Sequence, residues 1–319
     1  MKSFVKEFTT LNYIINKSNN VLLFAHTNPD GDTIGANLAL REYIASLGKK
    51  VDIACFDPFP NYLNEIFHAE FVFPDKLDMS SYDAVIACDS VERGFDRIFE
   101  KISLNQATVL IDHHPDIHLQ GDANIMDSSC SSVCEMIYRF FVFCNLKITK
   151  EIATCLMAGI LGDTGSFQHS NTSTYVMNIA SDLMKKGAPI SKIVDIVFAN
   201  KKISTLKLWG RAFEKAKINP RNGMIATVLT EDDIKDCEAS TEDIAQVASI
   251  LNTVPGTKFS LILSQREGDN IKGSLRSEEY KGVDVSEIAH QFGGGGHKLA
   301  SGFEVKGKIV ETEEGWEIV

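Results

Sequence analysis

The sequence lacks a hydrophobic run long enough to cross a membrane. The longest apolar stretches, such as Val21–Ala25 and Ala84–Cys88, have the length of strands, whereas a transmembrane helix needs about 20 apolar residues. The N-terminus also lacks the basic segment and apolar core of a secretion signal, and residues 3–19 instead show helical periodicity. We therefore expect a cytoplasmic protein without a membrane partner.

A disulfide framework and a broad basic surface are missing as well. The seven cysteines are odd in number and include no Cys-x-x-Cys pair, which favours reduced, buried thiols in a cytosolic protein. The 43 Asp and Glu residues outnumber the 32 Lys and Arg residues, and the net charge is −11. This charge argues against a protein that coats long nucleic acid. A short anionic substrate remains compatible with it, because metal ions can supply positive charge locally.

The 319 residues exceed the length of one average domain, and the pattern changes along the chain. In the first part, helical stretches alternate with strand-like runs at residues 21–25, 51–55, 71–73, 83–88 and 107–111. This alternation predicts an α/β domain with a doubly wound, mostly parallel sheet. Residues 173–217 read as helical throughout, and Asn219–Gly223 is a turn-rich break. We expect a catalytic domain at 1–200, a helical linker at 201–220, and a smaller mixed α+β domain at 221–319.

Charged and histidine side chains follow several of the predicted elements. These residues are His26, Asp30 and Asp32 after the first strand, Asp89 after the run at 83–88, Asp112, His113 and His114 after the run at 107–111, and Asp163 at the end of a helix. Ligands bind open α/β sheets at the carboxyl ends of the strands. So many carboxylates at one edge would repel one another unless cations neutralise them. The pattern therefore predicts more than one divalent metal ion.

A two-metal site fits the hydrolysis of phosphate esters, since the metals generate a hydroxide and stabilise charge on the phosphoryl oxygens. We assign the ligands as His26, Asp30 and Asp89 for one ion and Asp32, Asp89, His113 and Asp163 for the other, with Asp89 bridging. Mixed oxygen and imidazole ligands suit manganese, iron or zinc, and magnesium is possible. Asp112 is expected to orient an imidazole. His114 either orients a metal ligand or donates a proton to the scissile phosphate or the leaving oxygen.

Each of these residues has a structural alternative. Asp30 and Asp32 are also typical of the turn that caps a helix, and Asp89 of a cap at a strand end. Asp163 could cap the next helix, and a single His26 or His113 would more often be a hydrogen-bonded structural histidine. The joint pattern favours a functional site, because independent caps have no reason to gather histidines at one sheet edge.

A glycine run marks the second domain. Gly293–Gly296, which includes Gly294 and Gly295, exposes backbone N–H groups and is either an anion-binding nest or a flexible loop. His297 and Lys298 follow directly and favour a contact with phosphate or nucleotide. Arg276 ends a predicted strand and is either a bidentate phosphate ligand or an exposed surface arginine.

Together these motifs resemble those of the DHH phosphoesterases. The matching segments are His26-x-Asn28-Pro29-Asp30-Gly31-Asp32, Asp89-Ser90, Asp112-His113-His114, Gly162-Asp163-Thr164-Gly165, and Gly293–His297 with Ala300-Ser301-Gly302. The first four stand in the family's order, and the last resembles the DHH-associated substrate-binding domain. The resemblance covers nearly the whole chain.

Within the family, the size and domain pair are most similar to the small nanoRNases. The resemblance implies an enzyme that trims RNA of about two to five nucleotides to mononucleotides and also removes the 3′-phosphate of adenosine 3′,5′-bisphosphate. It further implies two Mn²⁺ ions per site, an active-site cleft between the domains, and binding of substrate by Arg276, His297 and the glycine run. A homodimer is expected only by analogy.

Other functions remain open at the level of sequence. A hydrolase of linear or cyclic dinucleotides is the nearest alternative, and a pyrophosphatase is a more distant one. A non-enzymatic nucleotide-binding module would need a degenerate site, whereas every expected ligand is present.

Overall fold

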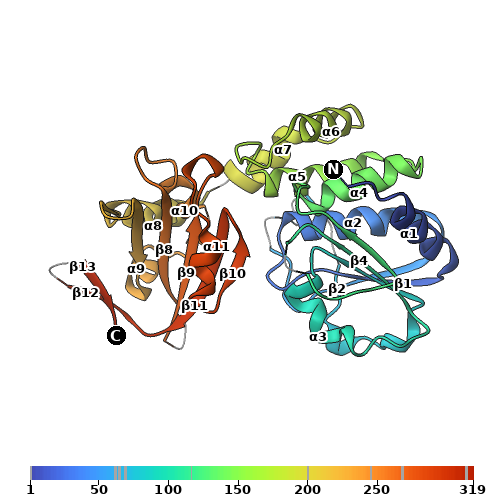
Figure 1. The fold of residues 1–319 in the computed structure, drawn as a ribbon, viewed down its shortest axis with the longest axis horizontal. Helices are drawn as coiled ribbons and strands as arrows, with labels where there is room; N and C mark the ends of the chain where they lie inside the picture. The colour runs from blue at the N-terminus through green and yellow to red at the C-terminus, as the bar shows by residue number, and fades with distance from the viewer. Residues whose placement is uncertain are drawn as a thin grey trace. The chain divides into compact units, whose positions relative to one another are not determined.

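The computed structural model describes residues 2–60, 63, 66–67, 70–115, 117–199, 201–244, 246–266, 269–312 and 315–319. Contacts between residues divide the chain into two compact units, residues 1–200 and 201–319 (Figure 1). Within the described ranges, no helix has the length and apolar character needed to cross a bilayer.

The first unit is an α/β domain. Its helices and strands are α1 (Val5–Lys17), β1 (Asn20–Phe24), α2 (Gly31–Ser46), β2 (Lys50–Ala54), β3 (Ala84–Cys88), α3 (Asp96–Phe99), β4 (Ala107–Asp112), β5 (Ala123–Met126), α4 (Val133–Phe143), α5 (Lys150–Asp163), α6 (Thr174–Lys185) and α7 (Ile190–Val194). The five strands are all parallel and follow the order β2-β1-β3-β4-β5. The predicted doubly wound parallel sheet is confirmed.

The order of the strands creates a switch point between β1 and β3. From β1 the chain moves outward to β2, and it then returns to build β3, β4 and β5 on the other side of β1. Connections on the two sides of such a point run in opposite directions, which leaves a crevice at the carboxyl ends of the two strands. The residues that follow β1 and β3 are therefore placed where open sheets bind ligands.

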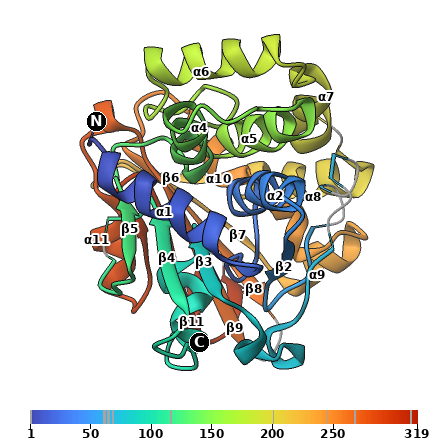
Figure 2. The same ribbon diagram turned by 90° about the vertical axis from the view of Figure 1, so that its right-hand side faces the viewer.

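Both faces of this sheet are buried. Leu23 of β1 and Ile86 of β3 pack in the core under α1, α2, α4 and α5, whereas Phe24 and Val85 pack on the opposite face with Phe95 and the region of α3. Figures 1 and 2 show α2, α4 and α5 side by side on one side of the strands. Burial on both faces explains why these strands read as continuous apolar runs rather than as alternating ones.

Two details of the first unit differ from the sequence prediction. Residues 71–73 contribute a single parallel bridge, between Ala54 and Val72, instead of a strand. The fifth strand is β5, which was not predicted because its four residues, Ala123–Met126, alternate in burial and form no apolar run.

The second unit contains a six-stranded mixed sheet and a separate hairpin. Its elements are α8 (Ile203–Glu214), β6 (Lys217–Asn219), β7 (Met224–Leu229), α9 (Glu231–Asp236), α10 (Val247–Leu251), β8 (Phe259–Arg266), β9 (Asn270–Arg276), α11 (Val285–His290), β10 (Gly295–His297), β11 (Ala300–Lys306), β12 (Ile309–Thr312) and β13 (Gly315–Ile318). The sheet order is β10-β11-β9-β8-β7-β6, and β12 pairs with β13. The predicted smaller α+β domain is thus present.

The border between the units lies before the helix that we expected to be a linker. Leu208 and Ala212 of α8 pack in the core of the second unit with Ile225 of β7. The turn at residues 219–223 joins β6 to β7 inside that unit. The apolar face of α8 packs against the second unit. The sequence of a charged helix does not indicate against which unit its apolar face will pack. Two short helical pieces, residues 241–244 and α10, lie between α9 and β8, and Gln246 precedes α10 with a left-handed φ of 74°.

Candidate functional site

The loops that follow β1 and β3 are tied together at the switch point. The backbone N–H of His26 donates to Thr33 Oγ1 over 3.3 Å. The Thr33 hydroxyl donates to the carbonyl of Cys88 at the end of β3, and the Ser90 hydroxyl donates back to the carbonyl of Phe24 at the end of β1. These crossed bonds fix the frame from which the site residues project.

A first group of ligand atoms comes from His26, Asp30 and Asp89. The three atoms lie within 4.8 Å of one another, with His26 Nε2 at 3.3 Å from Asp30 Oδ2 and 3.4 Å from Asp89 Oδ2. His26 is fully buried, and its Nδ1–H donates to the carbonyl of Thr27 over 2.7 Å. In the neutral ring, that bond places the proton on Nδ1 and leaves the lone pair of Nε2 toward the carboxylates.

Asp30 serves two purposes in this group. Its Oδ1 atom accepts hydrogen bonds from the N–H groups of Asp32 and Thr33 and caps α2, while Oδ2 faces His26. The helix cap that competed with a ligand role at the level of sequence is therefore real. The cap is compatible with a ligand role, because the two roles would use different oxygens.

A second group of ligand atoms is formed by Asp32, Asp89 and His113, again within 4.8 Å of one another. His113 Nε2 lies 3.7 Å from Asp89 Oδ1 and 3.2 Å from Asp163 Oδ2. Asp89 thus belongs to both groups, one oxygen facing each. It holds this position with a left-handed φ of 58°, a conformation that aspartate and asparagine adopt more readily than most residues.

The N-terminus of α4 positions Asp32. Its two carboxylate oxygens accept from the N–H groups of Val133 and Cys134, over 2.6 and 2.9 Å. Gly159 of α5 makes room for this contact, because a Cβ at that position would lie 2.7 Å from Asp32 Oδ1 and 2.3 Å from Cys134 Sγ. The helix dipole of α4 favours the ionised form of the carboxylate.

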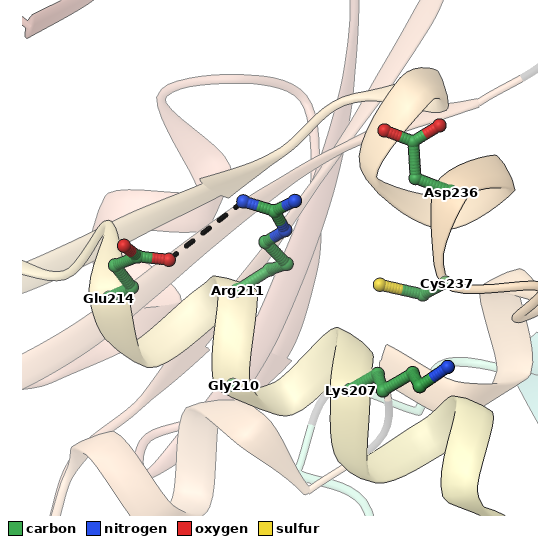
Figure 3. Close-up of a pocket in the computed structure, with 6 residues that line it drawn as sticks. All are labelled: Lys207, Gly210, Arg211, Glu214, Asp236 and Cys237. Atoms are coloured by element: carbon green, nitrogen blue, oxygen red, sulfur yellow. Dashed lines mark ion pairs between the residues drawn. The ribbon is translucent and has the colours of Figure 1, made fainter.

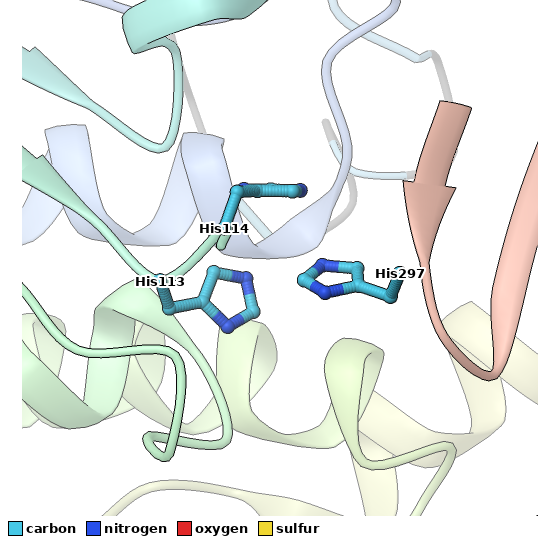
Figure 4. A group of neighbouring side chains, drawn as sticks. All are labelled: His113, His114 and His297. Atoms are coloured by element: carbon cyan, nitrogen blue, oxygen red, sulfur yellow. The ribbon is translucent and has the colours of Figure 1, made fainter. Parts of the chain in front are cut away.

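Asp112 and His114 form a separate pair beside the two groups. The ring Nδ1–H of His114 donates to Asp112 Oδ1 over 2.7 Å, and the other oxygen of Asp112 accepts from the N–H of Val91. His114 Nδ1 also lies 3.4 Å from Asp89 Oδ1. Figure 4 shows the rings of His113 and His114 beyond the end of β4. The hydrogen bond from His114 to Asp112 is the contact through which an orienting role, expected from the sequence, would be exerted.

The electrostatics of the site reflect crowded negative charge. Burial raises the pKa of Asp32, and the charges of Asp89 and Asp30 raise it further, to about 8. Burial and neighbouring carboxylates also hold the pKa of Asp163 well above its ordinary value. Burial lowers the pKa of His26, but Asp30 and Asp89 outweigh that effect and raise it to about 10. Protons therefore occupy the site at neutral pH unless cations replace them.

The donor set fits divalent metal ions. Each group combines imidazole nitrogen with carboxylate oxygen, the mixture that manganese, iron and zinc accept. Two buried atoms in the middle of the site, His26 Nε2 and Asp89 Oδ1, have no hydrogen-bond partner among the described residues. Buried polar atoms without a partner are costly, and an ion would satisfy both.

Sequence reasoning missed Arg93. This residue lies in the loop after β3, and its Nη1 atom is 3.9 Å from Asp89 Oδ2. The positive charge of Arg93 lowers the pKa values of His26, Asp30 and Asp163. Its only signal in the sequence is a position four residues after Asp89, which is not distinctive.

In the second unit, pairing of three strands brings Arg276 and His297 into one row. Ala300 of β11 is opposite His297 on one side and opposite Arg276 on the other. Residues directly opposite each other in antiparallel strands share a face of the sheet, so the two side chains lie on the same face. Arg276 is half-buried, and its Nη1 donates to the carbonyl of Leu275. Figure 4 includes His297 at the end of β10.

Two of the four glycines of the run, Gly295 and Gly296, lie in an edge strand, whereas Gly293 lies in the preceding turn. Gly295–His297 form β10, which pairs with β11. A Cβ on Gly294 would lie 2.1 Å from the carbonyl oxygen of Gly302, and Gly296 combines a φ of 135° with a Cβ position 2.7 Å from the carbonyl oxygen of Ala300. A Cβ on Gly295, by contrast, would come no closer than 3.7 Å, to His290 Nε2. Close strand packing explains Gly294 and Gly296, and Gly295 is the open position.

Lys298 lies in the turn between β10 and β11. Its Nζ atom is 2.8 Å from Glu279 Oε1, so its charge is already paired within the second unit. Both side chains are exposed, and the pair is weak in water.

A cavity of about 430 Å³ in the second unit is lined by Lys207, Gly210, Arg211, Glu214, Asp236 and Cys237 (Figure 3). Arg211 and Glu214 pair across 3.9 Å. The lining mixes charges of both signs without a convergent set of ligand atoms, unlike the two groups in the first unit.

Comparison with known protein families gives two matches. Residues 20–160 match the DHH family, N-terminal domain, and residues 222–314 match the DHHA1 domain. The first match contains seven of the eight histidines and aspartates of the site, and Asp163 lies just beyond it. The second contains Arg276 and the glycine run.

Two curated relatives are similar over most of their length. The bifunctional oligoribonuclease and PAP phosphatase NrnA of Bacillus subtilis is 28% identical over 293 residues, which cover 89% of this chain and 89% of the relative. The protein of the same name from Thermus thermophilus is 28% identical over 300 residues, which cover 94% and 87%.

Solved structures share the fold. An exopolyphosphatase-related protein from Bacteroides fragilis has a TM-score of 0.86 and 24% identity, with 97% of this chain and 92% of that chain covered. RecJ from Thermus thermophilus in complex with Mn²⁺ has a TM-score of 0.56 and 13% identity, with 95% and 52% covered.

Proposed function

Because the chain belongs to the DHH family of phosphoesterases, with a DHHA1 domain after the DHH domain, we propose that it hydrolyses very short RNA to mononucleotides. We propose in addition that it removes the 3′-phosphate of adenosine 3′,5′-bisphosphate. The observation that carries the proposal is the sharing of Asp89 by two groups of ligand atoms. The names of the two NrnA relatives support the choice of substrates.

The residues of the first unit would hold two divalent ions. His26, Asp30 and Asp89 would bind one, and Asp32, Asp89, His113 and Asp163 the other. The ions would supply a nucleophile from water at neutral pH and neutralise charge on the phosphoryl oxygens. Manganese is the ion that we propose, since the donor set suits it and RecJ, which shares the fold, was crystallised with Mn²⁺.

His114 would act on protons at the site. Burial lowers its pKa, but the hydrogen bond and charge of Asp112 outweigh burial and raise it. A protonated His114 held by Asp112 is suited to donate to the scissile phosphate or to the leaving oxygen. Asp112 would act as a positioning residue, since both its oxygens are occupied by His114 and by Val91.

The second unit would provide the substrate contacts. Arg276 and His297 share one face of the sheet, two strands apart, with the small residue Ala300 between them. A guanidinium and an imidazole in one row suit phosphate groups of a short nucleotide chain. A protein with a net charge of −11 offers long RNA little general attraction, so the shortest substrates should be preferred.

A manganese-dependent activity panel tests the proposal. The substrates are a dinucleotide, a five-nucleotide RNA, a long RNA, adenosine 3′,5′-bisphosphate, a cyclic dinucleotide and pyrophosphate, each with Asp89→Asn as the inactive control. We expect mononucleotides from the dinucleotide and the five-nucleotide RNA, and phosphate from the bisphosphate. Faster cleavage of long RNA, of the cyclic dinucleotide or of pyrophosphate would reject it.

A further inference from the structure

Arg93 lies beside the carboxylates of the site, but its guanidinium makes no close hydrogen bond to Asp89. Its Nη1 atom lies 3.9 Å from Asp89 Oδ2, which is beyond hydrogen-bond distance. The Arg93 side chain is 40% exposed, whereas that of Asp89 is 2% exposed. Among the described residues, the guanidinium has no hydrogen-bond acceptor, and Asp89 approaches it only to 3.9 Å. A planar group with five N–H donors is therefore partly open to solvent beside the site.

The backbone that carries this side chain is fixed. The N–H of Arg93 donates to the carbonyl of Ser90, and its own carbonyl accepts from the N–H of Thr27 over 2.9 Å and from the Thr27 hydroxyl. Gly94 follows with a φ of 122°, and a Cβ there would meet Thr27 Cγ2 at 3.1 Å. These contacts join the loop after β3 to the loop after β1 and fix the backbone from which the Arg93 side chain extends.

A cation at this position carries a cost. Burial lowers the pKa of Arg93, but the surrounding carboxylates, Asp89 first, outweigh it and keep the guanidinium charged. A fixed positive charge beside Asp89 weakens the attraction of that carboxylate for metal ions. Neutralisation of the site alone would be served better by direct hydrogen bonds to a carboxylate than by an approach of 3.9 Å.

We propose that Arg93 binds a non-bridging oxygen of the substrate phosphate that undergoes hydrolysis. The inference rests on the proposed function, since it concerns the same site. The Nη1 atom of Arg93 lies 3.9 Å from Asp89, the residue shared by both ligand groups. A guanidinium there adds charge-assisted hydrogen bonds to a phosphoryl group and strengthens them as negative charge builds up on its oxygens.

Three variants separate this role from a structural one. Arg93→Gln removes the charge, and Arg93→Lys keeps the charge but loses the forked geometry. Arg97→Gln is the matched control, because Arg97 lies on the next turn of the same segment and its guanidinium instead packs over the ring of Phe56 at 5.2 Å. For each protein, calorimetry measures the affinity for Mn²⁺ first, and then the affinity of the manganese-loaded protein for adenosine 5′-monophosphate. Steady-state kinetics with a dinucleotide follow.

We expect Arg93→Gln to weaken binding of the monophosphate about 10- to 100-fold and to lower kcat/KM by at least as much. Its affinity for Mn²⁺ should be unchanged or higher, Arg93→Lys should fall between, and Arg97→Gln should match the wild type. Unchanged monophosphate binding in Arg93→Gln, a parallel loss of Mn²⁺ affinity, or absence of monophosphate binding by the wild type would each overturn the inference. A wild type that binds the monophosphate through Arg93 but cleaves no dinucleotide would reject the proposed function alone.

Discussion

The Nε2 atom of His26 lies 3.4 Å from Oδ2 of Asp89. The tautomer of His26 is fixed by its bond to the Thr27 carbonyl, so two electron-rich atoms face each other in a buried position. In the absence of a cation the two atoms attract each other when a proton lies between them, and the pKa of His26, raised to about 10, places that proton on the imidazole. A divalent ion would take the place of that proton and bind both.

Replacement of Asp89 by asparagine should abolish turnover. The change keeps the left-handed backbone accessible, but it removes the charge shared by both ligand groups. We expect kcat to fall about 1,000-fold or more, because several kcal/mol of charge stabilisation depends on the ions. The control is Asp83→Asn, which precedes the same strand and accepts hydrogen bonds from the N–H groups of Asn19 and Asn20. Substantial turnover by Asp89→Asn in the presence of Mn²⁺ would refute a shared ligand.

Much of the first unit could be predicted from sequence, because its strands are buried on both faces and its site residues follow those strands directly. His26 and Asp89 could be placed at one edge because each follows a predicted strand of a parallel sheet. The sequence could not predict which partner each carboxylate oxygen would contact. Asp30 splits its two oxygens between the α2 cap and His26, and Asp32 is held by the N-terminus of α4, which is about 100 residues away in sequence.

The second unit was less predictable, for a physical reason. Its short edge strand β10 consists of two glycines and a histidine, a composition that reads as a loop because it has no apolar period. Pairing with β11 turns it into a strand, and that pairing depends on close backbone approach at Gly294 and Gly296. The charged helix α8 was similarly misplaced as a linker, because only its packing against β7 shows to which unit it belongs.

Metal binding should release protons, and its affinity should rise with pH. In the metal-free protein the pKa of Asp32 is raised to about 8 and that of His26 to about 10, so both carry a proton at pH 7. Ions that bind these residues must displace about two protons. Calorimetric titration with Mn²⁺ in two buffers of different ionisation enthalpy measures the number released. Binding that is independent of pH between 6 and 8 would contradict the assignment.

The same groups should make metal-free stability depend on pH. The pKa of Asp32 is higher in the folded state than its ordinary value of 3.8, so its contribution to stability is present at low pH and lost as pH rises toward 8. His26 behaves in the same way between its ordinary value of 6.5 and about 10. We therefore expect the increase in Tm caused by Mn²⁺ to be larger at pH 8 than at pH 6. Thermal unfolding at the two pH values, with and without Mn²⁺, checks this; an equal or smaller increase at pH 8 would count against it.

The glycines of the run should differ in what they tolerate. Gly294→Ala and Gly296→Ala place a Cβ against the backbone of β11 and should destabilise the second unit by about 1–3 kcal/mol. Gly295→Ala has room and should leave Tm nearly unchanged. If the backbone at Gly295 contacts substrate, the same variant should still raise KM for a dinucleotide. Thermal unfolding and kinetics together separate packing from binding, and a loss of stability in Gly295→Ala equal to that in Gly294→Ala would show that the separation is wrong.

Arg276 and Lys298 should differ as substrate ligands although both are cations near the hairpin of β10 and β11. Arg276 lies in the row with His297, whereas Lys298 is paired with Glu279. We expect Arg276→Ala to raise KM for a dinucleotide about 10- to 100-fold, since a charge-assisted bond to phosphate is lost. Lys298→Ala should change KM less than about threefold, because the exposed pair contributes little. Measurements at low and high salt sharpen the comparison: the defect of Arg276→Ala should persist, and any effect of Lys298→Ala should shrink as salt screens it. A larger effect of Lys298→Ala than of Arg276→Ala would indicate that the phosphate is bound at the turn between β10 and β11 and not on the sheet face.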